Sequence, residues 1–266
     1  MRHHSRCLLF TLALLLAGTV TPGRADELAE KGRQIFKKYQ HAVVTIRAVL
    51  KMSGGGRSSE TPQELTGTVV DPSGLTVLSL SACDPAEMYQ RMMSDEASKM
   101  KLDTEVTDIK ILLDDGTEIP SEIVLRDKDL DLLFIRPKSK PASPMVAVDL
   151  TKSAAVQVLD QVITLNRLNS AAGRAYAASV ERINAVIQKP RSFYIPDSSM
   201  TATTLGSPAF TLDGNVVGVF LMRSISAKGG GTRNYRESMT TIILPTDDVL
   251  KAAKQAPEAK GGEEKK

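Results

Sequence analysis

The chain has 266 residues, with 34 lysines and arginines, 31 aspartates and glutamates, and a formal net charge of +3. The near balance of basic and acidic residues removes the electrostatic argument for nucleic-acid binding, and with no tryptophan and only 4% aromatic residues the chain offers little for stacking bases. A chain of this length can bury a sizeable core, as one large β domain or as two half-domains.

The first 25 residues have the pattern of a secretory signal peptide. Arg2 and Arg6 precede an apolar run over residues 7–17, which is too short to span a bilayer, and residues 23–25 read Gly-Arg-Ala before Asp26. We therefore expect residues 1–25 to be removed and the protein to be exported, either periplasmic or extracellular, without a stable membrane anchor. The leader carries three arginines and no acidic residue, so the mature chain is expected to be neutral.

Cysteine is scarce once the leader is removed. Cys83 then stands alone, so no disulfide can form within the chain and stability must come from packing. We expect Cys83 to be a small buried side chain; an intermolecular link and a reactive thiol are the alternatives. No pair of Cys or His residues in the mature chain has the spacing of metal ligands, and the sequence predicts neither a metal nor a cofactor.

A short helix is predicted at the start of the mature chain, over residues 26–41. Leu28, Ile35, Phe36 and Tyr39 fall near one helical face. Acidic residues come early in this segment and lysines come late, as the helix dipole favours.

From residue 42 onward the pattern is that of strands. Short β-branched runs are bounded by Gly, Pro, Asp and Ser, as in all-β folds. The predicted strands lie at residues 43–46, 67–70, 75–78, 109–113, 119–125, 132–135, 156–165, 176–186, 209–212, 216–222 and 239–244. Residues 213–215, Asp-Gly-Asn, form a predicted hairpin turn. A short helix is expected from Thr246 to about Lys254, and residues 255–266 are expected to be disordered.

One helical insertion interrupts the strands. Asp84, Pro85 and Glu87 combine an N-cap, a proline at the first helical position and an acidic residue three positions after the cap. Four methionines follow, at positions 88, 92, 93 and 100. We expect them to pack against the strands; a pliable binding face is the alternative.

Three stretches, at residues 67–83, 114–135 and 197–219, together resemble the HtrA-type branch of the trypsin-like serine proteases. Their order and spacing carry the resemblance, which covers residues 42–251. It implies an all-β domain over residues 42–254, built of two six-stranded antiparallel β-barrels with a cleft between them. The PDZ module that usually follows this domain is not expected, because too few residues remain after Lys251.

The resemblance also places the family's catalytic residues on this sequence. The family's His, Asp and Ser fall on Ser81, Asp131 and Leu205, so only the aspartate matches. The loop that forms the family's oxyanion hole, Gly-Asn-Ser-Gly-Gly-Pro, becomes Thr203, Thr204, Leu205, Gly206, Ser207 and Pro208. The glycine whose amide helps to bind the oxyanion is therefore replaced as well.

The histidines point to the same conclusion without any alignment. A serine nucleophile needs a base held within hydrogen-bond reach, and His41 is the one imidazole left after the leader is removed. His41 precedes the first strand and is expected to be a surface residue. Ser207 is the nearest replacement for a nucleophile at position 205, but two residues along a strand displace it by about 6 to 7 Å. A Ser–Lys arrangement using Ser81 or Ser207 remains open.

The leading hypothesis is an exported pseudoprotease that serves as a binding or scaffolding module, with a peptide or protein partner in the cleft. By resemblance, a partner strand would pair with a free backbone edge at Leu221, Met222 and Arg223, beside an apolar surface at Leu205. Asp131 is then expected to be structural. The alternatives are an active serine hydrolase with an unconventional nucleophile and a structural envelope protein with a filled cleft. The sequence predicts no particular oligomeric state.

Overall fold

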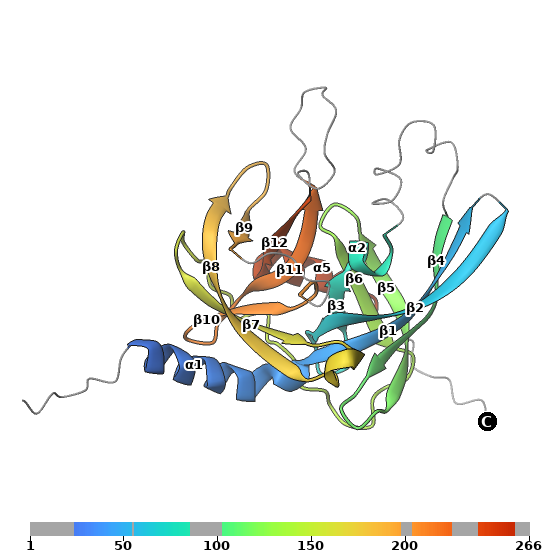
Figure 1. The fold of residues 1–266 in the computed structure, drawn as a ribbon, viewed down its shortest axis with the longest axis horizontal. Helices are drawn as coiled ribbons and strands as arrows, with labels where there is room; N and C mark the ends of the chain where they lie inside the picture. Colours follow the sequence, from blue (N-terminus) through green and yellow to red (C-terminus); the bar gives the residue numbers. More distant parts are fainter. Residues whose placement is uncertain (1–23, 55, 86–102, 198–203, 225–238, 259–266) are drawn as a thin grey trace, which may run out of the picture.

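The computed structural model describes residues 24–54, 56–85, 103–197, 204–224 and 239–258, and Figure 1 shows how they are arranged. Two closed barrels of six strands each account for most of this part of the chain. Every strand pairing within them is antiparallel. The all-β, two-barrel fold expected from the resemblance is therefore confirmed.

The first barrel is built from the N-terminal half of the chain. Its strands are β1 (Val43–Gly54), β2 (Arg57–Val69), β3 (Thr76–Ser79), β4 (Asp103–Leu112), β5 (Glu118–Asp127) and β6 (Leu132–Pro137). They close in the order β1-β2-β3-β6-β5-β4. The interior is aliphatic, with Ile46, Leu78, Ile111, Leu133 and Ile135 all at 1% exposure or less.

The second barrel follows the same plan. Its strands are β7 (Gln161–Arg167), β8 (Tyr176–Ile187), β9 (Phe193–Pro196), β10 (Pro208–Thr211), β11 (Val216–Ser224) and β12 (Met239–Pro245), closed in the order β10-β11-β12-β9-β8-β7. The predicted hairpin turn joins β10 to β11, where Gly214 adopts a φ of 80° and its N–H donates to the Thr211 carbonyl at 2.9 Å. A positive φ is what such a turn requires, and glycine meets it without strain.

Short helices frame the barrels. They are α1 (Arg24–Tyr39), the 3-10 turns η1 (Gln40–Ala42) and η3 (Ser170–Ala172), α2 (Leu80–Cys83) and α5 (Thr246–Ala253). Helix α1 lies against the second barrel, where the Tyr39 ring stacks on Phe210 with the ring centroids 4.7 Å apart. In the described residues, no helix is both long and apolar enough to cross a membrane.

The predicted insertion cannot be compared in full. Helix α2 ends at Cys83, Asp84 and Pro85 are not helical, and the four methionines fall outside the described residues. Cys83 itself is fully buried, as expected, and burial raises the pKa of its thiol to about 12, so it stays protonated and unreactive at neutral pH.

Strands β1 and β2 are much longer than the sequence suggested. They pair without interruption from Val43 opposite Thr68 to Gly54 opposite Arg57, through a polar stretch of β2 that has no strand pattern. The first six residues of β2 are exposed. Pairing with a neighbouring strand therefore overrides the weak local preference of this segment.

Candidate functional site

The three positions that correspond to the catalytic triad lie in separate turns. Ser81 is on α2, directly after β3; Asp131 is in the turn before β6; Leu205 is in the turn before β10. Strands β3 and β6 pair so that Ser79 is opposite Leu132, and the Leu80 N–H donates to the Asp131 carbonyl at 2.9 Å. This pairing brings Ser81 and Asp131 together, as the resemblance implies.

The Asp131 carboxylate is held by three donors. Oδ1 accepts the Ser81 backbone N–H at 2.7 Å, and Oδ2 accepts both the Ser79 hydroxyl at 2.7 Å and the Met222 N–H at 3.0 Å. Ser79 and Ser81 belong to the first barrel and Met222 to the second. In the protease family this carboxylate orients an imidazole. Here it accepts hydrogen bonds from both barrels and so links them.

The environment of Asp131 also changes its acidity. Burial raises the pKa of the carboxyl above its ordinary value, and the hydrogen bonds from Ser79, Met222 and Ser81 offset part of that rise. The backbone here has a φ of 60°, in the left-handed region that aspartate tolerates better than most residues. The Ser79 hydroxyl and the Ser81 backbone N–H make the short contacts with this carboxylate, and the Ser81 side chain also acts to lower its pKa, in line with the expected contact.

The loop around position 205 is packed against the first barrel. The Gly206 N–H donates to the Phe220 carbonyl at 2.7 Å, and the Gly206 carbonyl accepts the Thr68 hydroxyl at 2.7 Å. Leu205 is only 4% exposed. The expectation that Leu205 offers apolar surface to a partner is therefore wrong, because this side chain belongs to the core.

Ser207, the nearest serine to position 205, lies where a substrate cannot reach it. Ser207 is fully buried, and its hydroxyl has no hydrogen-bond partner. Thr204 is half-buried, and Thr203 lies outside the described residues. A hydroxyl must be exposed to attack a peptide bond, so the geometry removes Ser207 as a candidate.

The proposed peptide-binding edge is only partly free. Strand β11 pairs with β12 on one side, with Leu221 opposite Ile242 and Met222 opposite Thr241. On its other side, the Met222 N–H donates to Asp131. The expectation of an unpaired edge is therefore wrong at Met222, because a carboxylate without a histidine partner binds this amide instead. Arg223 lies over the Phe193 ring, 5.2 Å from its centroid.

His41 lies in a different polar cluster, which sequence analysis did not identify. Its Nδ1 is 2.8 Å from Asp114 Oδ2 and 3.1 Å from the Tyr176 hydroxyl. The Tyr176 hydroxyl also donates to Asp114, and the Arg167 guanidinium bonds to Asp114 and lies 4.1 Å from the centroid of the Tyr176 ring.

This cluster fixes the imidazole away from the triad positions. Burial alone would raise the pKa of the Asp114 carboxyl, but hydrogen bonds from Tyr176, Arg167 and His41 hold it below its ordinary value. No hydrogen bond or ion pair between described residues links His41 to Ser81, Asp131 or Leu205. The sequence carried no signal for the cluster, because its members come from η1, β7, β8 and the turn after β4.

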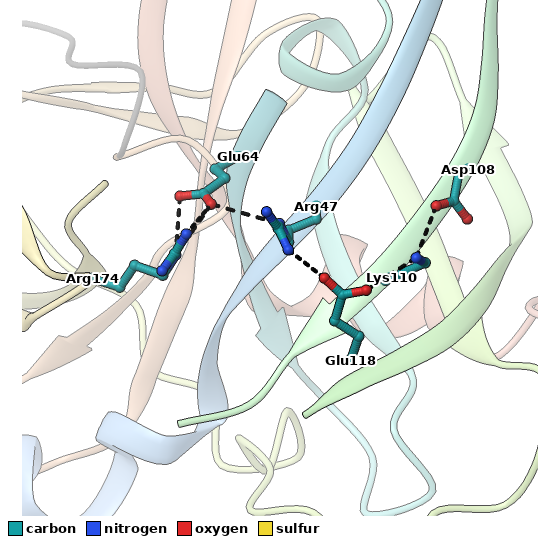
Figure 2. A network of polar contacts seen from close by, with 6 residues as sticks. All are labelled: Arg47, Glu64, Asp108, Lys110, Glu118 and Arg174. Atoms are coloured by element: carbon teal, nitrogen blue, oxygen red, sulfur yellow. Dashed lines mark hydrogen bonds and ion pairs between the residues drawn. The ribbon is translucent and has the colours of Figure 1, made fainter. Parts of the chain in front are cut away.

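A cavity of about 580 Å³ lies between the outer face of the first barrel and the turn after β7. Figure 2 shows six charged side chains of this region, of which all but Arg174 line the cavity. Glu118 bridges Arg47 and Lys110, Lys110 also contacts Asp108, and Glu64 lies between Arg47 and Arg174.

The register of the strands explains why these oppositely charged side chains meet. Arg47 on β1 stands directly opposite Glu64 on β2 and Lys110 on β4, and two cations side by side would be destabilising without Glu118 between them. Arg174 belongs to the β7–β8 hairpin, and its Nε lies 3.1 and 3.2 Å from the two Glu64 carboxylate oxygens. The contact ties the second barrel to the first. Each of the six charged side chains pairs with one of opposite charge, so their charges cancel within the network.

Comparisons with known proteins agree with this geometry. A family model described as the trypsin-like peptidase domain matches residues 36–219. The chain is also 26% identical over 184 residues to "Putative protease Do-like 14" of Arabidopsis thaliana. That match covers 67% of this chain and 40% of the plant protein, so the chain spans less than half of that relative's length.

Proposed function

The chain belongs to the trypsin-like peptidase domain family, and from this premise we propose that it is an exported, non-proteolytic member that acts as a binding or scaffolding module. The contacts of Asp131 carry the proposal. In a working triad this carboxylate orients a histidine, whereas here Ser79, Ser81 and Met222 use its acceptor positions.

The nucleophile and the general base of the triad also have no suitable side chain here. Leu205 has no nucleophilic atom and is buried, and His41 is bound in the Asp114 cluster. Loss of a triad serine or histidine costs on the order of a millionfold in kcat in the subtilisin example, where the members act as a unit. The residual rate expected here is therefore too low to support turnover.

The binding role is supported by what the frame retains. The two barrels are intact, and the cavity between the first barrel and the β7–β8 turn is within the size range of ligand sites, roughly 300–1,000 Å³. A partner peptide or protein segment is expected there or along the part of β11 that Asp131 leaves free. Export rests on the pattern of residues 1–25.

Hydrolysis of fluorescein-labelled casein tests the proposal. We expect no cleavage by the purified protein, and no gain from Leu205→Ser or Ser81→His alone, because each supplies one member of a unit that needs three. Trypsin under the same conditions is the positive control. Sustained cleavage by the wild type, or strong cleavage by Leu205→Ser alone, would show that another base is already in place.

A further inference from the structure

Helix α5 lies where the two barrels meet. Its Val249 is fully buried and its Ala252 is 3% exposed. Both side chains belong to one apolar cluster, which includes Phe134 from the first barrel and Leu244 from the second. Because α5 follows β12 directly, the chain leaves the second barrel here and packs against the seam between the two barrels.

Residues 254–257 carry the chain from α5 to the first barrel. The Ala256 N–H donates to the Ala253 carbonyl at 3.1 Å, so the helix ends in a tight turn. The Pro257 carbonyl then accepts the Nε–H of Arg136 at 3.1 Å. Arg136 belongs to β6, so this hydrogen bond fastens a segment that starts on the second barrel to the first barrel.

Arg136 is charged and yet only 8% exposed. Its Nη1 donates to the Ser73 hydroxyl at 2.6 Å, and within the described ranges no carboxylate forms an ion pair with the guanidinium. Hydrogen bonds from Ser73 outweigh burial and, together with the charge of Arg136, hold the pKa of the Asp71 carboxyl below its ordinary value. A buried charge is costly unless hydrogen bonds satisfy it, so the guanidinium depends on the Pro257 carbonyl as an acceptor.

We propose that residues 246–257 form a clasp that holds the two barrels in one orientation, and that the bond from Arg136 to Pro257 closes it. The start of the clasp is tied to the second barrel, because the Thr246 hydroxyl donates to the Val216 carbonyl at 3.0 Å. When the Arg136 bond breaks, the clasp therefore loosens from the first barrel while its start stays on the second. Such a local opening needs less free energy than the unfolding of either barrel.

The clasp and the Asp131 contact act at opposite ends of one strand. The Met222 N–H on β11 donates to Asp131, which directly precedes β6, whereas Arg136 lies near the end of β6. An open clasp therefore leaves the barrels joined at the Asp131 end and frees them to shift at the other. This device belongs to the fold and is independent of the proposed binding role.

Thermal unfolding in a double-mutant cycle tests the bond that closes the clasp. In the mature chain, Arg136→Met should lower the melting temperature by about 3–6 °C. In a shortened chain that ends at Gln255 and so lacks Pro257, the same substitution should cause no further loss, because the bond is already absent. A chain that ends at Glu258 keeps Pro257 and should respond as the mature chain does. Lys138 is an exposed cation directly after β6, and Lys138→Met is the matched control that should leave the melting temperature unchanged.

Spin labels on the two barrels measure their orientation directly. Glu122→Cys on β5 and Asn184→Cys on β8 place the labels at exposed positions, while Cys83 is buried and stays unlabelled. Arg136→Met and the shortened chain should each at least double the width of the distance distribution, whereas Lys138→Met should not widen it. A merely local role of Arg136 in the first barrel would lower the melting temperature without widening this distribution.

Two results would overturn the proposal. One is a distance distribution as narrow in Arg136→Met and in the shortened chain as in the unaltered protein. The other is an equal loss of melting temperature from Arg136→Met in the shortened and the mature chains, which would show that the bond to Pro257 contributes nothing.

Discussion

Replacement of Gly206 by alanine is expected to destabilise the protein strongly. Gly206 has a φ of 90°, and an added Cβ would lie 2.2 Å from the Thr66 carbonyl oxygen and 3.4 Å from Leu78 Cα. Both are backbone atoms in the first barrel and cannot move aside. Strain and overlap together should cost more than about 4 kcal/mol, a large part of the roughly 5–15 kcal/mol by which domains are stable.

Gly116→Ala is the matched control for that substitution. Gly116 has a similar φ of 85°, but an added Cβ there would meet no atom within 4 Å. This variant should lose only about 1–2 kcal/mol from the left-handed conformation. Urea unfolding followed by circular dichroism measures both variants. Equal losses in the two would mean that the loop does not press against Thr66 as the structure shows.

Asp131→Ala is expected to cost about 2–4 kcal/mol of unfolding free energy. The substitution leaves the Ser81 and Met222 N–H groups without an acceptor, and an unsatisfied buried donor costs about 1–3 kcal/mol. Release of a desolvated carboxyl offsets part of that cost. Asp131→Asn keeps one acceptor oxygen and should lose less. The exposed neighbour Asp129 provides the control, and Asp129→Ala should change stability by less than about 0.5 kcal/mol.

The cost of Asp131→Ala should also depend on pH. Because burial raises the pKa of Asp131, the folded protein holds a proton at this site more tightly than the unfolded chain does. The contribution is fully present below the ordinary pKa of about 4 and is lost as the pH rises through the raised value. The difference in unfolding free energy between wild type and variant should therefore be larger near about pH 4 than near about pH 8. The opposite trend would mean that the hydrogen bonds outweigh burial and lower the pKa of the Asp131 carboxyl.

Local sequence patterns predicted many of the strands, the resemblance to the protease family implied the two barrels, and neither predicted the contacts between them. Turn residues such as Asp213 and Gly214 marked the hairpin directly, and the order of three stretches identified the two-barrel frame. The length of β2 was missed because its first half is polar and is held only by pairing with β1. Pairing partners distant in sequence leave no trace in a local pattern.

The site shows the same division. The resemblance to the protease family implied that Ser81 lies beside Asp131, and the pairing of β3 with β6 accounts for it. The resemblance gave no indication that the Met222 amide reaches Asp131 from the second barrel, or that Asp114 binds His41. Nor does the sequence around Leu159 contain a turn signal, since the left-handed conformation there is imposed by hydrogen bonds to β8.

A fluorophosphonate probe read out by intact-protein mass spectrometry tests the central claim most directly, because it reacts with any activated serine whatever the substrate preference. Among the described residues, His41 is bonded to Asp114 and not to Ser81, and Ser207 is buried, so we expect no adduct on the folded protein, while trypsin in the same tube is fully labelled. A stoichiometric adduct that maps to Ser81 or Ser207 would contradict the account and establish a working hydrolase in its place.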